Sequence, residues 1–167
     1  MGSFTAAATS APPGAHGLLF LPFLMGERGA RGGGAPGAFV GLTTEHTRSD
    51  LIRAVLEGVA FELRRLQERR GTPLPTDVLT LKGGGARNRL WCRIVSAVFG
   101  IPYRTTDRDA AYGAALTAGV SQGWWPSWRS APGLSDQTNE SGLVDVEVLN
   151  DHYARYCAVV GLLTPDS

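Results

Sequence analysis

The stretch LTLKGGGARNRLWCRIV, residues 79–95, contains the unit around which the rest of the chain is organised. Its first residues have the length and side-chain branching of a buried strand, which the glycines Gly83, Gly84 and Gly85 interrupt. From Leu90 onward apolar residues recur about every 3.6 positions, as they do on an amphipathic helix. The stretch therefore predicts a strand that turns directly into a helix across three glycines.

Glycines at such a turn leave the main chain bare. Without Cβ atoms a flat ligand can lie on the backbone, and the free N–H groups of the helix offer donors and partial positive charge to phosphate oxygens. The segment is not a Walker loop, because no Gly-Lys-Ser/Thr follows, and it lacks the third glycine of the dinucleotide fingerprint GxGxxG. Spacing alone leaves two interpretations open, a nucleotide site and an ordinary tight turn.

Other segments alternate between strand and helix patterns around this unit. Thr47 and Asp50 fit a capping box before a long apolar-periodic segment, and a last amphipathic helix is expected from about residue 148 to 163. Short strands are expected within residues 17–24 and 103–105, and a helix rich in small residues within 110–122. The order predicts an α/β fold with ligand sites beyond the carboxyl ends of its strands. Residues 1–16 are expected to be a disordered lead-in, and 17–163 one domain.

Composition limits the classes of function. The chain has 167 residues, 43% of them hydrophobic, which suits one domain with a core. Its net charge of +1 gives no field that would attract nucleic acid or an anionic membrane. No signal peptide or 18-residue apolar run is present, so a cytoplasmic protein without a membrane partner is expected. Cys92 and Cys157 are expected to be reduced core thiols, and no metal site is expected.

Several other polar and aromatic residues have more than one interpretation. Glu57 beside Gly58 is expected to lie on a solvated helix face, with tight packing as the alternative. His46 fits a helix entry and His152 a packed position on the last helix. The tryptophans at 124, 125 and 128 suit the end of a core, although stacking on a sugar or base is the alternative.

Four segments resemble, in this order and spacing, the C-terminal half of the FGGY carbohydrate kinases, and within that family most closely the xylulose kinases. The segments are GLLFLPFLMGER (17–28), GAFVGLTTEHTRSDLIRAVLEGVAF (37–61), LKGGGARNRLWCRIVSAVFGIPYRT (81–105) and AAYGAALTAGVSQGWWPSW (110–128). The resemblance runs from residue 17 to about 156. It implies an actin-like ATPase (ribonuclease H-like) fold, of which this chain is a partial C-terminal half, incomplete at its N-terminal side.

The resemblance also implies a set of site residues. The adenosine of ATP is expected against Gly83, Gly84, Gly85 and Ala86, with Asn88 hydrogen-bonded to the base. Glu27 and Arg28 are expected either near the interdomain cleft or in a surface ion pair, and the acidic residues that usually follow them in the family are missing. The resemblance puts the base aspartate and the loop that holds phosphate and Mg²⁺ in the other domain, so no catalytic residue is expected in this chain.

The expected activity is that of the complete enzyme, the ATP-dependent phosphorylation of D-xylulose to D-xylulose 5-phosphate. This chain alone is expected to be inactive and, because core surface would be exposed, to associate, with a homodimer as one form. Its expected ligands are ATP or ADP, with the sugar bound through the other domain. Two alternatives remain, a non-catalytic nucleotide-binding or interaction module, and a kinase for glycerol, gluconate or another pentulose.

Overall fold

The computed structural model describes residues 2–24, 36–74, 76–106, 110–127, 130–131, 138–140 and 143–163. Helices and strands alternate along most of this chain, as the sequence predicts. In order, the elements are α1 (Gly2–Ser10), η1 (Ala15–Gly17), β1 (Leu19–Leu21), β2 (Ala38–Val40), α2 (Arg48–Arg69), β3 (Leu79–Lys82), η2 (Gly84–Arg87), α3 (Arg89–Phe99), β4 (Tyr103–Thr106), α4 (Ala110–Ser121), β5 (Thr138–Glu140) and α5 (Val146–Leu163).

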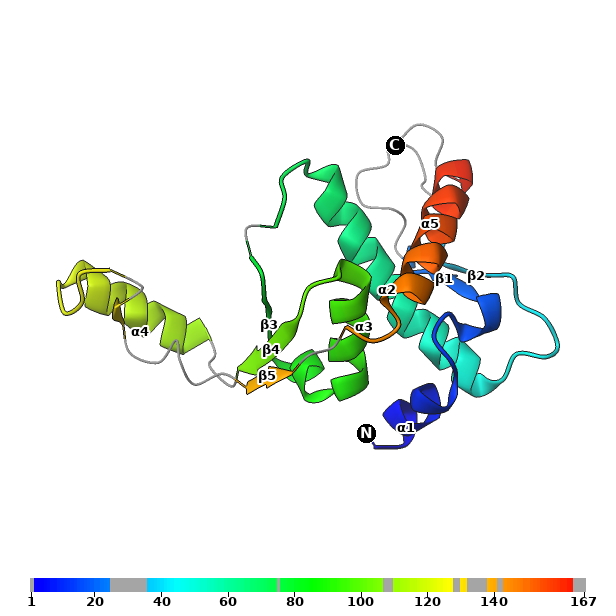
Figure 1. Ribbon diagram of the computed structural model, residues 1–167, viewed down its shortest axis with the longest axis horizontal. Coiled ribbons are helices and arrows are strands. Elements are labelled where there is room, and N and C mark those ends of the chain that lie inside the picture. Colours follow the sequence, from blue (N-terminus) through cyan, green and yellow to red (C-terminus); the bar gives the residue numbers. More distant parts are fainter. Residues whose placement is uncertain are drawn as a thin grey trace.

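The strands form two small sheets. β1 pairs antiparallel with β2, and the second sheet has the order β3-β4-β5. β3 and β4 are parallel, from Leu79 opposite Tyr103 to Lys82 opposite Thr106, and β5 is antiparallel to β4. Figure 1 shows α2 crossing the middle of the molecule, with β1 and β2 on one side, β3, β4 and β5 on the other, and α1 below it. The parallel pair places the carboxyl ends of β3 and β4 at one edge of the sheet, where the glycine turn begins.

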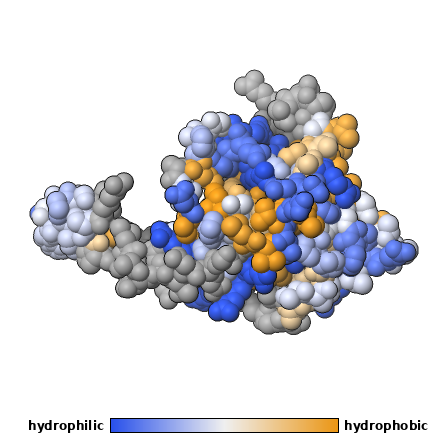
Figure 2. Space-filling model, in the orientation of Figure 1, coloured by the Kyte–Doolittle hydropathy of each residue, from blue (hydrophilic) through white to orange (hydrophobic). Residues whose placement is uncertain are grey.

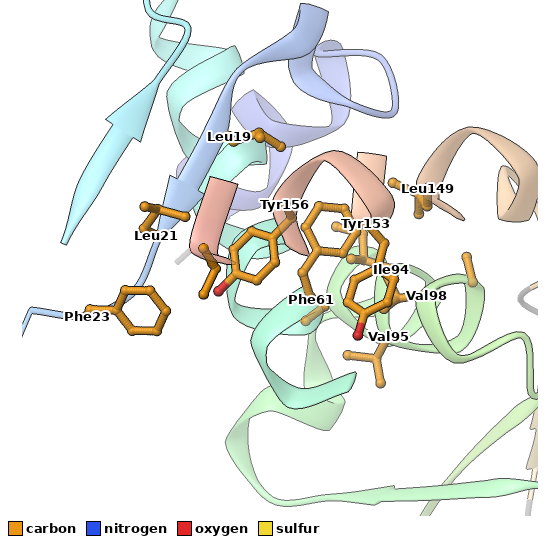
Figure 3. Packing of buried hydrophobic residues seen from close by; sticks show 13 residues of the cluster. Leu19, Leu21, Phe23, Phe61, Ile94, Val95, Val98, Leu149, Tyr153 and Tyr156 are labelled. Atoms are coloured by element: carbon orange, nitrogen blue, oxygen red, sulfur yellow. The ribbon is translucent and has the colours of Figure 1, made fainter. Parts of the chain in front are cut away.

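One apolar core joins β1, α2, α3 and α5. Phe61 of α2 lies at its centre, with its ring centroid 5.9 Å from that of Tyr153 and 5.6 Å from that of Tyr156 (Figure 3). The tyrosine hydroxyls do not stay unpaired, because they donate to Glu68 and Glu62 of α2. The larger members of the cluster are Leu19, Leu21, Phe23, Phe61, Ile94, Val95, Val98, Leu149, Tyr153 and Tyr156.

The first residues of the chain differ from the sequence-based expectation. The prediction of a disordered lead-in over residues 1–16 disagrees with the structure, in which α1 forms a helix and the following segment packs on α2. Ala8 and Ala15 are fully buried and Ala11 nearly so. Small side chains bury little area each, but they let a segment lie close against a helix, which composition alone does not reveal.

A buried ion pair holds this N-terminal segment to α2. Glu57 is 2% exposed and Arg53 5%, and Arg53 Nε donates to Glu57 Oε1 over 2.5 Å. Both carboxylate oxygens of Glu57 also accept from the N–H of Gly14 at 3.1 Å. Burial raises the pKa of the Glu57 carboxyl, while Arg53 and the Gly14 N–H oppose that shift. The expectation of a solvated face for Glu57 is therefore wrong.

A second polar contact lies in the first turn of α2, at Asp50. The backbone N–H and hydroxyl of Thr47 both donate to Asp50 Oδ2, so the predicted capping box is present. His16 Nδ1 lies 2.8 Å from Asp50 Oδ1, which ties η1 to the same helix end. Burial would raise the pKa of Asp50, but the hydrogen bonds from Thr47 and His16 outweigh it and lower the pKa to about 2.

Helix α4 stands apart from the rest of the molecule (Figure 1). Among its described side-chain positions only Leu116 and Gly119 are buried. Gly119 is covered by the ring of Trp125, and the 71% exposed Trp124 meets that ring edge-on, so neither tryptophan belongs to the main core. Trp128 lies outside the described residues. In the part of the chain that the structure describes, no helix is long and apolar enough to cross a membrane.

Gly58 sets how closely β1 approaches α2. A Cβ built on Gly58 would lie 2.1 Å from the carbonyl oxygen of Phe20, which is backbone and cannot rotate away. We predict that Gly58→Ala lowers the free energy of unfolding by about 2 kcal/mol, because overpacking outweighs the better helix propensity of alanine.

The matched control is Gly161→Ala in α5, where an added Cβ meets no atom within 4 Å. This substitution should leave stability unchanged or raise it by up to about 1 kcal/mol. Urea unfolding followed by circular dichroism measures both variants. Equal stability of the two would show that β1 does not lie against α2 at this glycine.

Candidate functional site

The predicted strand, turn and helix are present in the structure. β3 ends at Lys82, Gly83 has φ 82° and ψ −162°, and one turn of 3-10 helix, η2, leads into α3. The N–H of Ala86 donates to the carbonyl of Gly83, and that of Asn88 to the carbonyl of Gly85. The chain thus reverses over a few residues at the carboxyl edge of the parallel strands. That edge is where open α/β sheets place their ligands.

The three glycines have different surroundings. A Cβ built on Gly83 or Gly84 meets no atom within 4 Å, so the bare main chain faces open space at both positions. A Cβ on Gly85 would lie 3.2 Å from Nε1 of Trp91, so this glycine packs against a side chain of its own following helix. Two of the three glycines are therefore open for a ligand, and the third has a packing role.

Asn88 forms the N-cap of α3. Its Oδ1 accepts from the N–H of Trp91 at 3.2 Å, which satisfies one of the free donors at the start of the helix. The amide Nδ2 has no partner among the described residues, so it is available as a donor to a ligand. Below the turn, the fully buried Sγ of Cys92 lies 3.5 Å from the carbonyl oxygen of Ala86. Cys92 and Cys157 do not form a disulfide, and Cys92 is buried in the core whereas Cys157 is only half-buried.

The remaining candidates lie away from the turn. His46 Nδ1 accepts from the N–H of Thr43 at 3.0 Å before α2, which fits the predicted helix entry. His152 packs against Gly14, and burial lowers the pKa of its imidazole. Glu27 and Arg28 lie outside the described residues. The small-residue face of α4, Gly113 to Ala115, is exposed and is not packed beside the turn.

Arg53 and Glu57 are the charged residues that sequence reasoning missed. Their (i, i+4) spacing is common on solvated helix faces, so spacing alone did not mark them as buried. The small neighbours Ala54 and Gly58 were the available sign, since they indicate that another segment lies close to this face. Within the described residues no group of three or more His, Cys, Asp or Glu side chains could hold a metal ion.

Two cavities lie elsewhere on the molecule. One, of about 340 Å³, is bordered by the segment after α1, by α3 and by the start of α5. The other, of about 470 Å³, lies beside the carboxyl end of α2. Neither includes a residue of the glycine turn among its described lining residues, and Gly83, Gly84 and Gly85 are exposed.

Comparison with known proteins identifies relatives among sugar kinases. A xylulose kinase of Staphylococcus epidermidis is 33% identical over 129 residues, 74% of this chain and 26% of that protein. A glycerol kinase of Gloeobacter violaceus is also 33% identical, over 155 residues, 89% of this chain and 31% of that protein. The crystal structure of xylulose kinase from Rhodospirillum rubrum matches with a TM-score of 0.80 and 29% identity, over 98% of this chain and 34% of that one.

These matches confirm the expected fold. Such kinases have the actin-like ATPase fold, and the chain corresponds to their C-terminal domain, spanning about a quarter of the length of the S. epidermidis relative. Residues 2–122 match the C-terminal domain of the FGGY family of carbohydrate kinases. The chain belongs to the FGGY family of carbohydrate kinases.

Proposed function

We propose that this chain provides the adenosine-binding surface of an ATP-dependent carbohydrate kinase, with Gly83, Gly84, Gly85, Ala86 and Asn88 beside the nucleotide. The observation that carries the proposal is the open main chain at Gly83 and Gly84, at the carboxyl edge of β3 and β4. Family membership supplies the class of reaction, the transfer of a phosphoryl group to a carbohydrate hydroxyl.

In this proposal the chain binds and orients the nucleotide. The purine lies on the bare main chain, where a side chain would occupy its place. Asn88 Nδ2 donates to a ring nitrogen of the base while Oδ1 still accepts from the N–H of Trp91. The same side chain therefore caps α3 and forms a hydrogen bond with the ligand. Glu27 and Arg28 are proposed to lie at the cleft between domains, as the resemblance suggests.

Mg²⁺ does not fit the described residues, which hold no acidic cluster suited to it. The resemblance assigns the metal, the phosphate loop and the base aspartate to the domain that this chain does not match. We therefore assign no step of phosphoryl transfer to this chain, whose contribution is binding. The cytoplasmic location and the homodimer expected from the sequence remain part of the proposal.

The sugar proposed for the complete enzyme is D-xylulose, with D-xylulose 5-phosphate as product. Several similar proteins are named xylulose kinase, including that of Escherichia coli at 38% identity over 121 residues. Glycerol is the second candidate, because the G. violaceus glycerol kinase matches a larger part of the chain at the same identity as the S. epidermidis xylulose kinase.

The first prediction concerns Gly84. Wild-type chain should bind ADP, and Gly84→Val should weaken binding about ten-fold or more, because the branched side chain occupies the proposed place of the purine. Gly161→Val in α5 also adds a side chain in open space and serves as the control. Isothermal titration with ADP measures all three proteins. If the folded wild-type chain gives no heat, or if Gly84→Val binds as well as wild type, the proposed site is wrong.

A second prediction separates the two roles of Asn88. Asn88→Asp keeps an N-cap acceptor, so its free energy of unfolding should stay within about 0.5 kcal/mol of wild type. The change removes the Nδ2 donor, so affinity for the uncharged probe adenosine should fall about five-fold or more. Titration with adenosine avoids repulsion between the new carboxylate and phosphate. If the affinity for adenosine is unchanged, Asn88 caps α3 and does not contact the base.

The purified chain should bind ADP without catalysing transfer. We expect no ATP-dependent phosphorylation of D-xylulose or glycerol above the buffer rate, because the groups that activate the hydroxyl and hold Mg²⁺ are assigned elsewhere. A coupled ADP-release assay with Mg²⁺ present measures this, with the E. coli xylulose kinase as the positive control. Turnover by the chain alone would contradict the assignment.

A further inference from the structure

We propose that the cavity of about 340 Å³ between the segment after α1, α3 and the start of α5 binds a small aliphatic carboxylate. This site is separate from the glycine turn and goes beyond the proposed kinase function. Its described lining combines two arginines, one aspartate and an apolar floor. The lining residues are Thr9, Ser10, Ala11, Pro12, Pro13, Arg53, Leu90, Arg93, Ile94, Ala97, Val144, Asp145 and Leu149.

Arg53 is the main reason to expect a ligand. Its side chain is 6% exposed and lines the cavity, yet Nε, bonded to Glu57, is its only nitrogen with a partner among the described residues. The two terminal nitrogens carry four N–H donors. Among the described residues, the buried side-chain atoms without a partner belong to His46 and His152, so the terminal nitrogens of Arg53 open onto the cavity and its solvent. A carboxylate can take the place of that solvent by accepting two parallel hydrogen bonds from the guanidinium fork.

A second arginine lines the same cavity. Arg93 projects from α3, its side chain is exposed, and no hydrogen bond or ion pair is formed by its guanidinium within the described residues. Its charge adds to the attraction for an anion at the mouth of the cavity. An accessible guanidinium without a partner among the described residues can add its own hydrogen bonds to a bound anion.

The charges around the cavity limit the ligand to one negative charge. Glu57 neutralises part of the charge of Arg53, and Asp145 lines the cavity and is near enough to raise the pKa of Glu57. Two cations facing two carboxylates leave little excess positive charge for a dianion such as phosphate. A monocarboxylate meets the guanidinium geometry with less repulsion from Asp145.

The floor of the cavity is apolar. Leu90, Ile94 and Ala97 of α3 and Leu149 of α5 contribute it, and Figure 2 shows apolar surface gathered over the region of α3. The volume falls within the usual range for small-ligand sites, about 300–1,000 Å³. An aliphatic tail of a few carbons on this floor, with its carboxylate at Arg53, matches both parts of the lining.

The experiment is a titration of the ¹⁵N-labelled chain with sodium butyrate, sodium phosphate and sodium chloride at matched ionic strength. Butyrate should shift the amide signals of Leu90, Ile94, Ala97 and Asp145 in a saturable way, and should not shift those of Gly83 and Gly84. Chloride should give no saturable shift, and phosphate should bind more weakly than butyrate. Tighter binding of phosphate would overturn the monocarboxylate assignment, and absence of saturable butyrate binding would overturn the site.

Four variants test the assigned contacts. Arg93→Gln should weaken butyrate binding about five-fold, whereas Arg70→Gln, which removes a charge at the far end of α2, should not. Arg53→Lys keeps a charge beside Glu57 but loses the fork, so binding should be lost while circular dichroism remains native. Asp145→Asn should tighten binding about three-fold or more, because a repelling charge is removed.

Asp145 has φ 67°, a conformation that asparagine also tolerates, so Asp145→Asn should fold. This variant keeps the proposal testable even if Arg53→Lys does not fold. Equal butyrate affinity of wild type, Arg93→Gln and Asp145→Asn would show that the arginines and the aspartate do not form a carboxylate site.

Discussion

The buried carboxylate of Glu57 connects three parts of this fold. It accepts the N–H of Gly14 with both oxygens and pairs with Arg53 one turn earlier on the same helix. A carboxylate removed from water is stable only while such partners remain, so the N-terminal segment cannot leave α2 without leaving a charge unpaired. The same pairing uses Arg53 Nε and leaves the terminal nitrogens of Arg53 to the adjacent cavity. The packing of the N-terminal segment and the orientation of Arg53 in the cavity thus both depend on the Arg53–Glu57 ion pair.

The apolar core places the glycine turn at the surface. α3 directs its apolar face toward Phe61 of α2 and toward α5 (Figure 3). The glycines that precede α3 are exposed. Asn88 then fixes where α3 begins. Trp91 and Cys92 contact the turn only from Gly85 onward, so the main chain at Gly83 and Gly84 stays open.

Local patterns in the sequence predicted local structure well. The strand, the glycine turn and α3 follow from residue types that act within a few positions of one another, as does the capping box of α2. The buried face of α2 was not predictable in this way. Leu63 and Leu66 follow the helical period but are 44% and 41% exposed, while Glu57 is buried. The helical period located α2, in which Ile52 is buried as well, but it did not identify Glu57 as buried, because the partners that permit a buried carboxylate, Gly14 and Arg53, do not show in apolar spacing.

The case for a ligand at the turn depends on Gly84 more than on its neighbours. Gly83 has φ 82°, so the turn itself requires glycine there, and Gly85 lies against Trp91, so packing explains it. At Gly84 the backbone does not adopt the left-handed conformation and nothing lies within 4 Å of the missing Cβ. Gly113 and Gly161 are open in the same way, so the open space at Gly84 permits a ligand without requiring one. What sets Gly84 apart is its place at the carboxyl edge of the parallel strands, which is why the proposed site is centred on it.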